Sequence, residues 1–395
     1  MIFLWPNGRL DFSPTLRKIH FIMHPLIDPE KQKIARRYKN DHMKVSVASY
    51  SVSAVLLVAL ILFKLSQWFC GRLGSFTDSR FLIALIYFAA LFIVYTVISF
   101  PFSYIGGFRI EHKYNFSTQN FKAWFGDEIK AFLIGFILGL IVFEVIYTVT
   151  FYAPVMWWLW LSLIMIGFSV ILANLFPILI LPLFYKTAPL DNEILKIRIA
   201  ELCHKAGINL QGVYGINLSS KSTKANAMVA GLGNTKRILL GDTLLSGYSE
   251  DEILSVLGHE ITHYREHHVW WLVIWQSLIT LGSFFVFSRI AGPVFRAGGF
   301  AAVSDIAAFP LFAIFFAVMS LITTPLSAAI SRHYEHRADR GALELTTDPE
   351  SFIRLMAKFC NNDLAIAYPN PLIEWYKYNH PSPGKRIQFA ETLRK

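Results

Sequence analysis

Six long apolar segments constrain this chain of 395 residues more than any other feature of its sequence. They lie at residues 45–63, 81–106, 131–153, 157–184, 269–288 and 306–330. An α-helix needs roughly 20 mostly apolar residues to cross the hydrocarbon core of a bilayer, and each segment is about that long or longer. Because charged residues make up only 16% of the chain, too little charge is present to cover several soluble domains. The sequence therefore predicts a mainly α-helical, polytopic membrane protein.

The fourth apolar segment is expected to end irregularly. It carries Asn174, Pro177 and Pro182, and a proline inside a helix removes a hydrogen bond and clashes with the preceding turn. Polar residues at bilayer depth often mark function, so Asn174 and also Glu144 in the third segment attract notice. Neither residue is assigned a role here, since an interhelical hydrogen bond explains Asn174 equally well.

The positions of lysine and arginine predict the topology. Cytoplasmic loops close to membrane spans carry an excess of these residues. Residues 1–44, 107–130, 185–268 and 331–395 hold 32 of the 37, and the alternate connections hold the other five. We therefore expect six spans with both chain ends in the cytoplasm. The net charge of +10 then follows from topology and anionic lipid headgroups, and it needs no nucleic-acid partner.

Residues 185–268 are long enough to fold outside the membrane. They are expected to form a helix over about 191–206, followed by a β-hairpin and a second helix. In the hairpin, Ala225–Ala230 and Lys236–Gly241 flank the turn-rich Gly231–Asn234. The tail after residue 330 is expected to continue the last span as a helix and then to break into loops rich in proline and asparagine.

The second of these helices carries the pattern H-E-x-x-H at His259–His263. Ser249 and Glu252 form a capping box that predicts where the helix begins. On a helix His259 and His263 lie one turn apart on the same face, so both imidazoles can reach one Zn²⁺ ion.

Glu260 is rotated about 100° from His259 around this helix. Its carboxylate can therefore take a proton from a metal-activated water without being a ligand itself. The alternative is a surface helix with solvated histidines, next to the equally histidine-rich His267 and His268.

A catalytic zinc site needs a third protein ligand and one open position. The richest candidate segment, His333–Asp339, begins just after the sixth apolar segment, whereas the H-E-x-x-H helix ends just before the fifth. Two consecutive spans return the chain to the same membrane face, so the two clusters can meet. Glu335 and Asp339 share a helix face, so one could bind metal while the other orients a ligand histidine. Taken alone, the segment is more typical of a juxtamembrane helix with salt bridges, and His333, His336 and His267 stay open as third ligands.

In these and other segments the sequence resembles the type I CAAX prenyl endopeptidases, which are integral-membrane zinc metalloproteases of the gluzincin kind, and their bacterial relatives. The similar segments are Ile110–Ser117, Asn226–Ala227, Lys236–Leu244, His259–His263, Glu335 with Asp339, His380–Pro381 and Arg386–Ile387. The family is described with seven spans, whereas six are evident here, and a seventh would have to lie within residues 1–44.

The resemblance implies a role for each matching residue. His259, His263 and Glu335 would bind one Zn²⁺ per chain, Glu260 would be the general base, Asp339 would orient a ligand, Asn226 and Ala227 would hold substrate backbone, and His380 and Arg386 would steady the oxyanion or substrate. Without the resemblance, Asn226 is more typical of a turn and His380 of a loop.

The chain is accordingly divided into five predicted parts. These are a basic cytoplasmic N-terminal segment (1–44), four transmembrane helices (45–184), a cytoplasmic catalytic segment (185–268), a transmembrane helical hairpin (269–330) and a cytoplasmic C-terminal segment (331–395). The catalytic parts are expected to form a small α+β zinc-protease domain on the cytoplasmic face of a bacterial inner membrane or of the endoplasmic reticulum.

The predicted function is zinc-dependent hydrolysis of peptide bonds in membrane-associated or prenylated, CAAX-type proteins by a monomer in a lipid bilayer. Three alternatives stay open: a bacterial quality-control protease without prenyl specificity, a zinc-binding membrane transporter without catalysis, and a catalytically idle relative acting as a chaperone. Glu260 separates hydrolase from transporter, since a transporter loop has no need of a non-ligand acid beside the first histidine.

Overall fold

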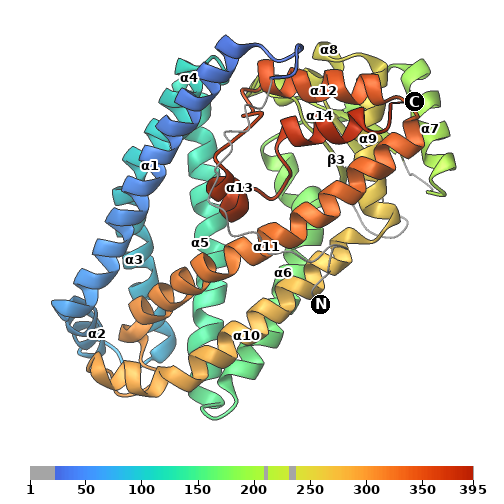
Figure 1. The fold of residues 1–395 in the computed structure, drawn as a ribbon. Helices are drawn as coiled ribbons and strands as arrows, with labels where there is room; N and C mark the ends of the chain where they lie inside the picture. The colour runs from blue at the N-terminus through green and yellow to red at the C-terminus, as the bar shows by residue number, and fades with distance from the viewer. Residues whose placement is uncertain (1–22, 209–211, 231–236, 395) are drawn as a thin grey trace, which may run out of the picture.

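The computed structural model describes residues 23–208, 212–230 and 237–394 (Figure 1). Within these residues six helical stretches are long and apolar enough to cross a membrane: Pro29–Leu62, Arg80–Lys113, Phe121–Tyr152, Trp157–Leu183, His268–Ala297 and Ile306–Thr346. Each overlaps one predicted apolar segment, which confirms the six spans and the mainly helical fold class. The question of a seventh span falls largely on residues 1–22, which lie outside the described residues; residues 29–44 extend the first long helix.

Most of the long helices are longer than a bilayer core is thick. They are α1 (Pro29–Leu62), α3 (Arg80–Ser103), α5 (Phe121–Tyr152), α6 (Trp157–Leu175), α10 (His268–Ala297) and α11 (Phe309–Thr346). At about 1.5 Å per residue, the 38 residues of α11 extend about 57 Å, against about 30 Å of hydrocarbon. The last turns of α11 therefore lie outside the lipid, where they can carry charged side chains.

Shorter helices gather at one end of the long ones. They are α7 (Glu193–Lys205), α8 (Asp242–Gly247), α9 (Glu250–Arg265), α12 (Pro349–Asn361), α13 (Pro371–Lys377) and α14 (Pro383–Glu391). Figure 1 shows α8, α9, α12 and α14 together at the top, while α2 (Leu65–Gly74) and the connection between α10 and α11 lie at the bottom. The remaining helical turns are η1 (Tyr104–Ile110), α4 (Glu111–Lys113), η2 (Phe176–Ile180), η3 (Leu181–Leu183), η4 (Leu218–Ser220) and η6 (Ile306–Ala308).

The fourth span ends irregularly, as predicted. Regular α-helix stops at Leu175 and is followed by the wide turn η2, which contains Pro177, and the tight turn η3, which contains Pro182. The side chain of Asn174 donates to the carbonyl of Val170 in its own helix, at 2.8 Å. The prolines therefore end the helix close to where the chain enters the next segment.

A small four-stranded sheet lies in the segment that follows, with strand order β1-β2-β4-β3. The strands are β1 (Thr187–Pro189), β2 (Gly212–Ile216), β3 (Ala227–Ala230) and β4 (Arg237–Gly241). β3 and β4 pair antiparallel, with Ala227 opposite Leu240, so the predicted hairpin strands are confirmed, while their turn lies outside the described residues. β1 and β2 were not predicted. Because β3 is at the edge of the sheet, one side of its backbone has no partner strand among the described residues.

The C-terminal tail is more helical than the sequence suggested, because its prolines begin helices instead of interrupting them. Pro349, Pro371 and Pro383 each occupy the first turn of a helix, where proline is well tolerated. The side chains of Asp348 and Asn370 cap the first two of these helices by accepting backbone N–H groups. The expectation of loops was wrong for α12, α13 and α14.

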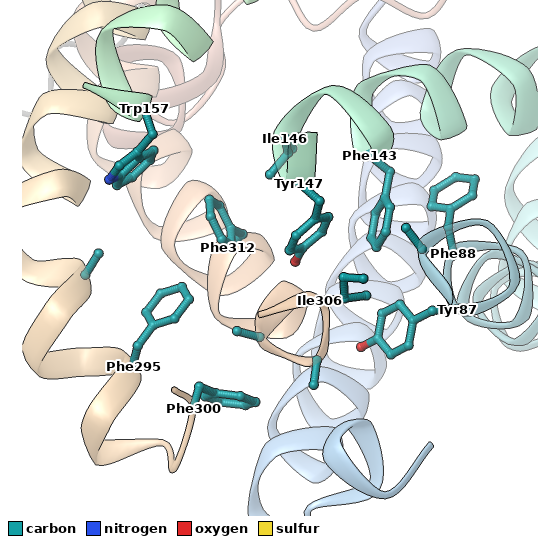
Figure 2. Close-up of a cluster of buried hydrophobic side chains, with 14 of the residues drawn as sticks. Tyr87, Phe88, Phe143, Ile146, Tyr147, Trp157, Phe295, Phe300, Ile306 and Phe312 are labelled. Atoms are coloured by element: carbon teal, nitrogen blue, oxygen red, sulfur yellow. The ribbon is translucent and has the colours of Figure 1, made fainter. Parts of the chain in front are cut away.

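At the opposite end of the molecule, aromatic side chains point toward one another (Figure 2). Phe312 of α11 is central to this cluster, with its ring centre 4.9 Å from that of Phe287, 5.7 Å from Phe295 and 6.2 Å from Trp157. These contacts join α11 to α10 and α6. The cluster therefore holds α10 and α11 together at the end of their hairpin that is opposite to the charged residues.

Candidate metal centre

The H-E-x-x-H sequence lies on α9, which begins as the capping box predicted. The backbone N–H of Ser249 donates to Glu252 Oε2 at 2.8 Å, and the N–H of Glu252 donates to Ser249 Oγ at 3.3 Å. The helix runs from Glu250 to Arg265 and places His259 and His263 on one face. Their Nε2 atoms are 3.1 Å apart.

Two glycines let α9 and α11 approach closely. A Cβ atom on Gly258 would lie 3.1 Å from the Cα atom of Ala342, and a Cβ atom on Gly341 would overlap the side chain of Thr262. Helices approach this closely only where small residues face each other. The two glycines therefore allow the helix that carries Glu335 to meet the helix that carries the histidines.

Glu335 completes a group whose geometry suits a metal ion. Its Oε2 atom is 3.1 Å from His259 Nε2, and its Oε1 atom is 3.4 Å from His263 Nε2. Ligands of a tetrahedral zinc ion, bonded at about 2.0–2.1 Å, lie about 3.3 Å from one another. The buried Oε2 atom makes no hydrogen bond of normal geometry, which leaves a lone pair for a cation. Among the described residues, these three side chains are those whose ligand atoms converge in this way.

His259 is held from behind by a buried ion pair. Its Nδ1 atom is 2.9 Å from Asp339 Oδ1, so an Nδ1–H donates to the carboxylate and Nε2 is left free for the metal. Arg386 of α14 donates to both oxygens of Asp339, from Nε at 2.9 Å and from Nη2 at 2.5 Å. Asp339 is fully buried, and such a contact fixes the tautomer and orientation of a ligand imidazole.

His263 is held by a different relay, which the sequence analysis missed. Its Nδ1 atom is 3.0 Å from Nδ1 of the buried His268, whose Nε2 atom is 3.0 Å from Glu266 Oε2. Arg337 pairs with the same Glu266 oxygen at 2.8 Å. His267 has a φ of 57°, in the left-handed region, and this sharp junction between α9 and α10 turns His268 back toward His263. The only signal in the sequence was the neighbouring pair His267 and His268. No glycine or asparagine marks a turn at this position, so the sequence did not predict the junction.

The remaining predicted site residues line one cavity of about 140 Å³ beside the histidines. Asn226, Ala227, Glu260, His380 and Arg386 all contribute to its wall, together with His259. Asn226 directly precedes the edge strand β3, and His380 Nε2 is 3.1 Å from Glu335 Oε2. Burial raises the pKa of the Glu260 carboxyl above its ordinary value, and the two neighbouring imidazoles oppose this shift. The structure thus brings together all nine residues singled out from the sequence.

The other histidines considered as ligands lie elsewhere. The ring of His336 packs on Phe389 at 4.3 Å between centres, and the ring of His333 lies beside that of Tyr334 at 5.6 Å. His267 lines a neighbouring cavity of about 310 Å³, whose wall also includes Glu260 and His263, but it does not belong to the converging group. Glu335 is the acid that the geometry places between the two histidines.

The segment at Ile110–Ser117 holds the chain that leads into the edge strand. Ser117 and Ser222 form an antiparallel bridge, and the N–H of Thr223 donates to the carbonyl of Phe116 at 3.0 Å. Lys224 donates to Glu111 Oε2 at 3.1 Å. This connection between the second and third spans therefore positions the backbone just before Asn226.

A larger cavity of about 960 Å³ lies between α5, α6, α10 and α11 and is lined mostly by apolar side chains. Lys377 and Asn379, close to His380 in the chain, also line it. Among the described residues, an apolar cavity between membrane-spanning helices thus occurs together with a group that suits a metal ion and an unpaired strand edge, the combination expected of an integral-membrane metallopeptidase.

Comparison with known proteins agrees with this class. Residues 21–186 match the family described as CAAX prenyl protease N-terminal, five membrane helices, and residues 189–394 match peptidase family M48. This chain belongs to peptidase family M48 and is a membrane metalloendopeptidase. The resemblance to the CAAX prenyl proteases is thereby confirmed, and the metalloprotease is favoured over the transporter.

Individual relatives support the same conclusion. An uncharacterized metalloprotease of Bacillus subtilis, YhfN, is 33% identical over 344 residues, which cover 85% of this chain and 79% of that protein. CAAX prenyl protease 1 of Saccharomyces cerevisiae is 29% identical over 314 residues, covering 74% of this chain and 68% of that protein. The crystal structure of S. mikatae Ste24p has the same fold, with a TM-score of 0.82 at 24% identity over 94% of this chain and 91% of that one.

Proposed function

We propose that this protein is a zinc-dependent endopeptidase that cleaves membrane-associated proteins, including prenylated proteins of the CAAX type, on the cytoplasmic side of its membrane. The observation that carries the proposal is the position of Glu260, which lines one cavity together with the ligand His259 and with Asn226 and Ala227 at the edge strand β3. Hydrolysis requires an acidic side chain at this place that does not bind the metal, because it must accept a proton from water. A protein that only stores or carries metal does not require one.

The donor set fits zinc, since two imidazoles and one carboxylate are typical ligands of catalytic zinc sites and leave a fourth position open. His259, His263 and Glu335 would hold one ion per chain. When bound, zinc would act as a Lewis acid that lowers the pKa of water and polarises the scissile carbonyl.

The side chains of this chain would move the protons. Glu260 takes a proton from the attacking water as its oxygen forms a bond to the carbonyl carbon, and then gives that proton to the leaving nitrogen as the C–N bond breaks. His380, close to Glu335 Oε2, donates a hydrogen bond to the oxygen that becomes negative. Asp339 and Arg386 keep His259 in the required tautomer.

The substrate backbone would add to the sheet as a strand beside β3, in hydrogen-bonding contact with Asn226 and Ala227. The mostly apolar cavity between α5, α6, α10 and α11 is large enough to accept an apolar chain next to the site. A bacterial role in degrading faulty membrane proteins, without prenyl specificity, is the second candidate, and it is favoured by the likeness to a Bacillus subtilis metalloprotease.

The test is cleavage of a prenylated peptide and its unprenylated twin by the purified, zinc-loaded chain. We expect Glu260→Gln to keep one zinc and to lose cleavage by about 10²- to 10⁴-fold, which is the usual contribution of general acid–base catalysis. Glu201→Gln, an exposed acid on α7, is the matched control and should cleave normally. Normal cleavage by Glu260→Gln would refute the general-base role, and equal rates on the two peptides would favour the quality-control candidate.

A further inference from the structure

Another cavity, of about 490 Å³, lies between α1 and the C-terminal segment around α13. Its wall includes Arg36 and Lys39 from α1 and Lys377 from the end of α13. Among the described residues that line it there is no aspartate or glutamate. The other polar residues of its wall are Asn40, His42, Ser46, Tyr368, Asn370 and Tyr378, and His42 Nε2 lies 2.9 Å from Glu111 Oε1.

None of the lysine and arginine side chains described in the wall of this cavity pairs with a carboxylate. In the described part of the chain, Arg36, Lys39 and Lys377 form no ion pair, whereas nearby cations do, for example Lys113 with Asp41 at 2.6 Å. Lys39 Nζ lies 5.7 Å from the centre of the Tyr378 ring, a contact that attracts a cation without neutralising it. Like charges that share a cavity repel one another, so an anion bound between them would be stabilised.

The cavity lies at the level where lipid headgroups are found. Lys39 is six residues before the first predicted span, which places it about 9 Å along α1 from the start of the apolar segment. Ser46, inside that span, also lines the cavity, so the space reaches from the polar region to the edge of the hydrocarbon. Tyrosines such as Tyr378 are enriched at this boundary. Basic pockets between helices at this depth are typical binding places for anionic headgroups.

We propose that this cavity binds the phosphate of an anionic lipid headgroup from the surrounding bilayer, held by Arg36, Lys39 and Lys377. Lys377 also lines the large cavity between the spans, and the chain continues from it to His380. Arg332 donates to the carbonyl of Tyr378 at 2.6 Å and so holds the same segment from its other side. A bound headgroup would therefore hold, together with Arg332, the segment that carries His380.

The test is lipid binding by the purified full chain in neutral detergent, counted by native mass spectrometry with phosphatidylglycerol and with phosphatidylcholine. We expect one phosphatidylglycerol per chain and no comparable binding of phosphatidylcholine. The double variant Lys39→Gln/Lys377→Gln should bind phosphatidylglycerol about 25-fold more weakly, since each lysine near a membrane surface contributes about fivefold. The matched control is Lys44→Gln/Lys122→Gln, which removes two exposed charges on the same side outside the cavity and should change the affinity less than twofold.

Two results would overturn the proposal. An equal loss in both double variants would mean that attraction to the lipid is diffuse and not located in this cavity. Displacement of the lipid by an equal concentration of inorganic phosphate would mean that the occupant is a free anion. Repeating the binding measurement with Glu260→Gln makes it independent of proteolysis, because that variant should bind the lipid as the unaltered chain does.

Discussion

The two ends of α11 are held in place by opposite kinds of interaction. Near its start, Phe312 packs among aromatic rings. About 35 Å further along the same helix, Glu335 and Asp339 lie among two histidines and an arginine. The difference teaches that the two ends of the helix have different roles. Apolar packing at one end holds the helix in place, whereas the buried charges at the other end contribute less to stability and are suited to binding and catalysis.

The largest expected effect tests the charged end. Glu335→Ala removes one of three ligands, so we expect the zinc content to fall from about one ion per chain to near none while the protein stays folded. Metal analysis after purification measures this. An unchanged zinc content would contradict the assignment and direct attention to His333, His336 or His267.

The aromatic end should respond in the opposite way. Phe312→Ala should lower the free energy of unfolding by about 3 kcal/mol, near the low end for buried Phe→Ala, because lipid also solvates an exposed ring. Zinc content should stay unchanged. Unfolding in detergent measures the change, and Leu321→Ala, at a side chain 61% exposed on the same helix, is the control and should cost little. Loss of zinc in Phe312→Ala would break the proposed division between the ends.

The relay behind His263 allows a finer test within the charged end. His268→Ala should weaken zinc binding about 10- to 100-fold, the usual cost of losing a residue that orients a metal ligand. His268→Gln should recover much of this, because an amide can accept from His263 and donate to Glu266. Competition with a chelator measures both. His267→Asn, which keeps a residue tolerant of the left-handed conformation, should bind zinc normally, and a loss as large as that of His268→Ala would count against the relay.

The smallest expected effect concerns the pH dependence of the charged end. Burial raises the pKa of the Asp363 carboxyl to about 6, near Tyr248 and the backbone of Ala225. Since this folded-state pKa exceeds the unfolded one, the neutral acid favours folding at low pH, and that contribution is lost as the pH rises from about 4 to 6. Asp363→Asn cannot titrate, so relative to the unaltered chain it should gain about 1–2 kcal/mol between pH 4 and pH 7.5, after allowance for partial exposure.

This difference is measured by unfolding the zinc-free protein at both pH values, so that loss of metal does not contribute. Asp191→Asn removes an exposed carboxylate and serves as the control. A constant difference between Asp363→Asn and the unaltered chain across this range would show that the buried carboxyl does not titrate as described. The stability difference between Phe312→Ala and the unaltered chain should not change with pH, because both proteins keep Asp363.

Much of the fold could be predicted because the signals are local. Apolar length alone identifies the six spans, and the capping box marks the start of α9. Predictions failed where one residue type occurs in two kinds of structure. The prolines of the tail suggest loops, but Pro349 and Pro371 stand in the first turn of helices whose N-terminal residues cap them. The three-residue strand β1 is too short for any periodicity to show.

The site could be predicted as far as its residue types and the orienting role of Asp339, but not in the contacts that hold His263 or in the close approach of the two helices. The segment that carries Glu335 could be chosen because two consecutive spans return the chain to the membrane face of the H-E-x-x-H helix, and the resemblance to the CAAX prenyl endopeptidases then singled out Glu335 within it. The relay through His268 could not be predicted, because it depends on a left-handed backbone conformation at His267. This conformation is usually signalled by a glycine, and here it is adopted by a histidine. The same holds for Gly258 and Gly341, whose value appears only when the two helices are in contact.

By itself, the order of amino acids determined which stretches enter lipid and which side chains can bind a metal, since these properties depend on composition over a helix and on spacing over one turn. Only the folded chain decided how these side chains are held. Asp339 and Arg386, 80 and 127 residues away from His259 along the chain, meet it because α9, α11 and α14 pack together. Contacts between residues so far apart in the chain arise from the packing of whole helices, and a short sequence pattern cannot predict them.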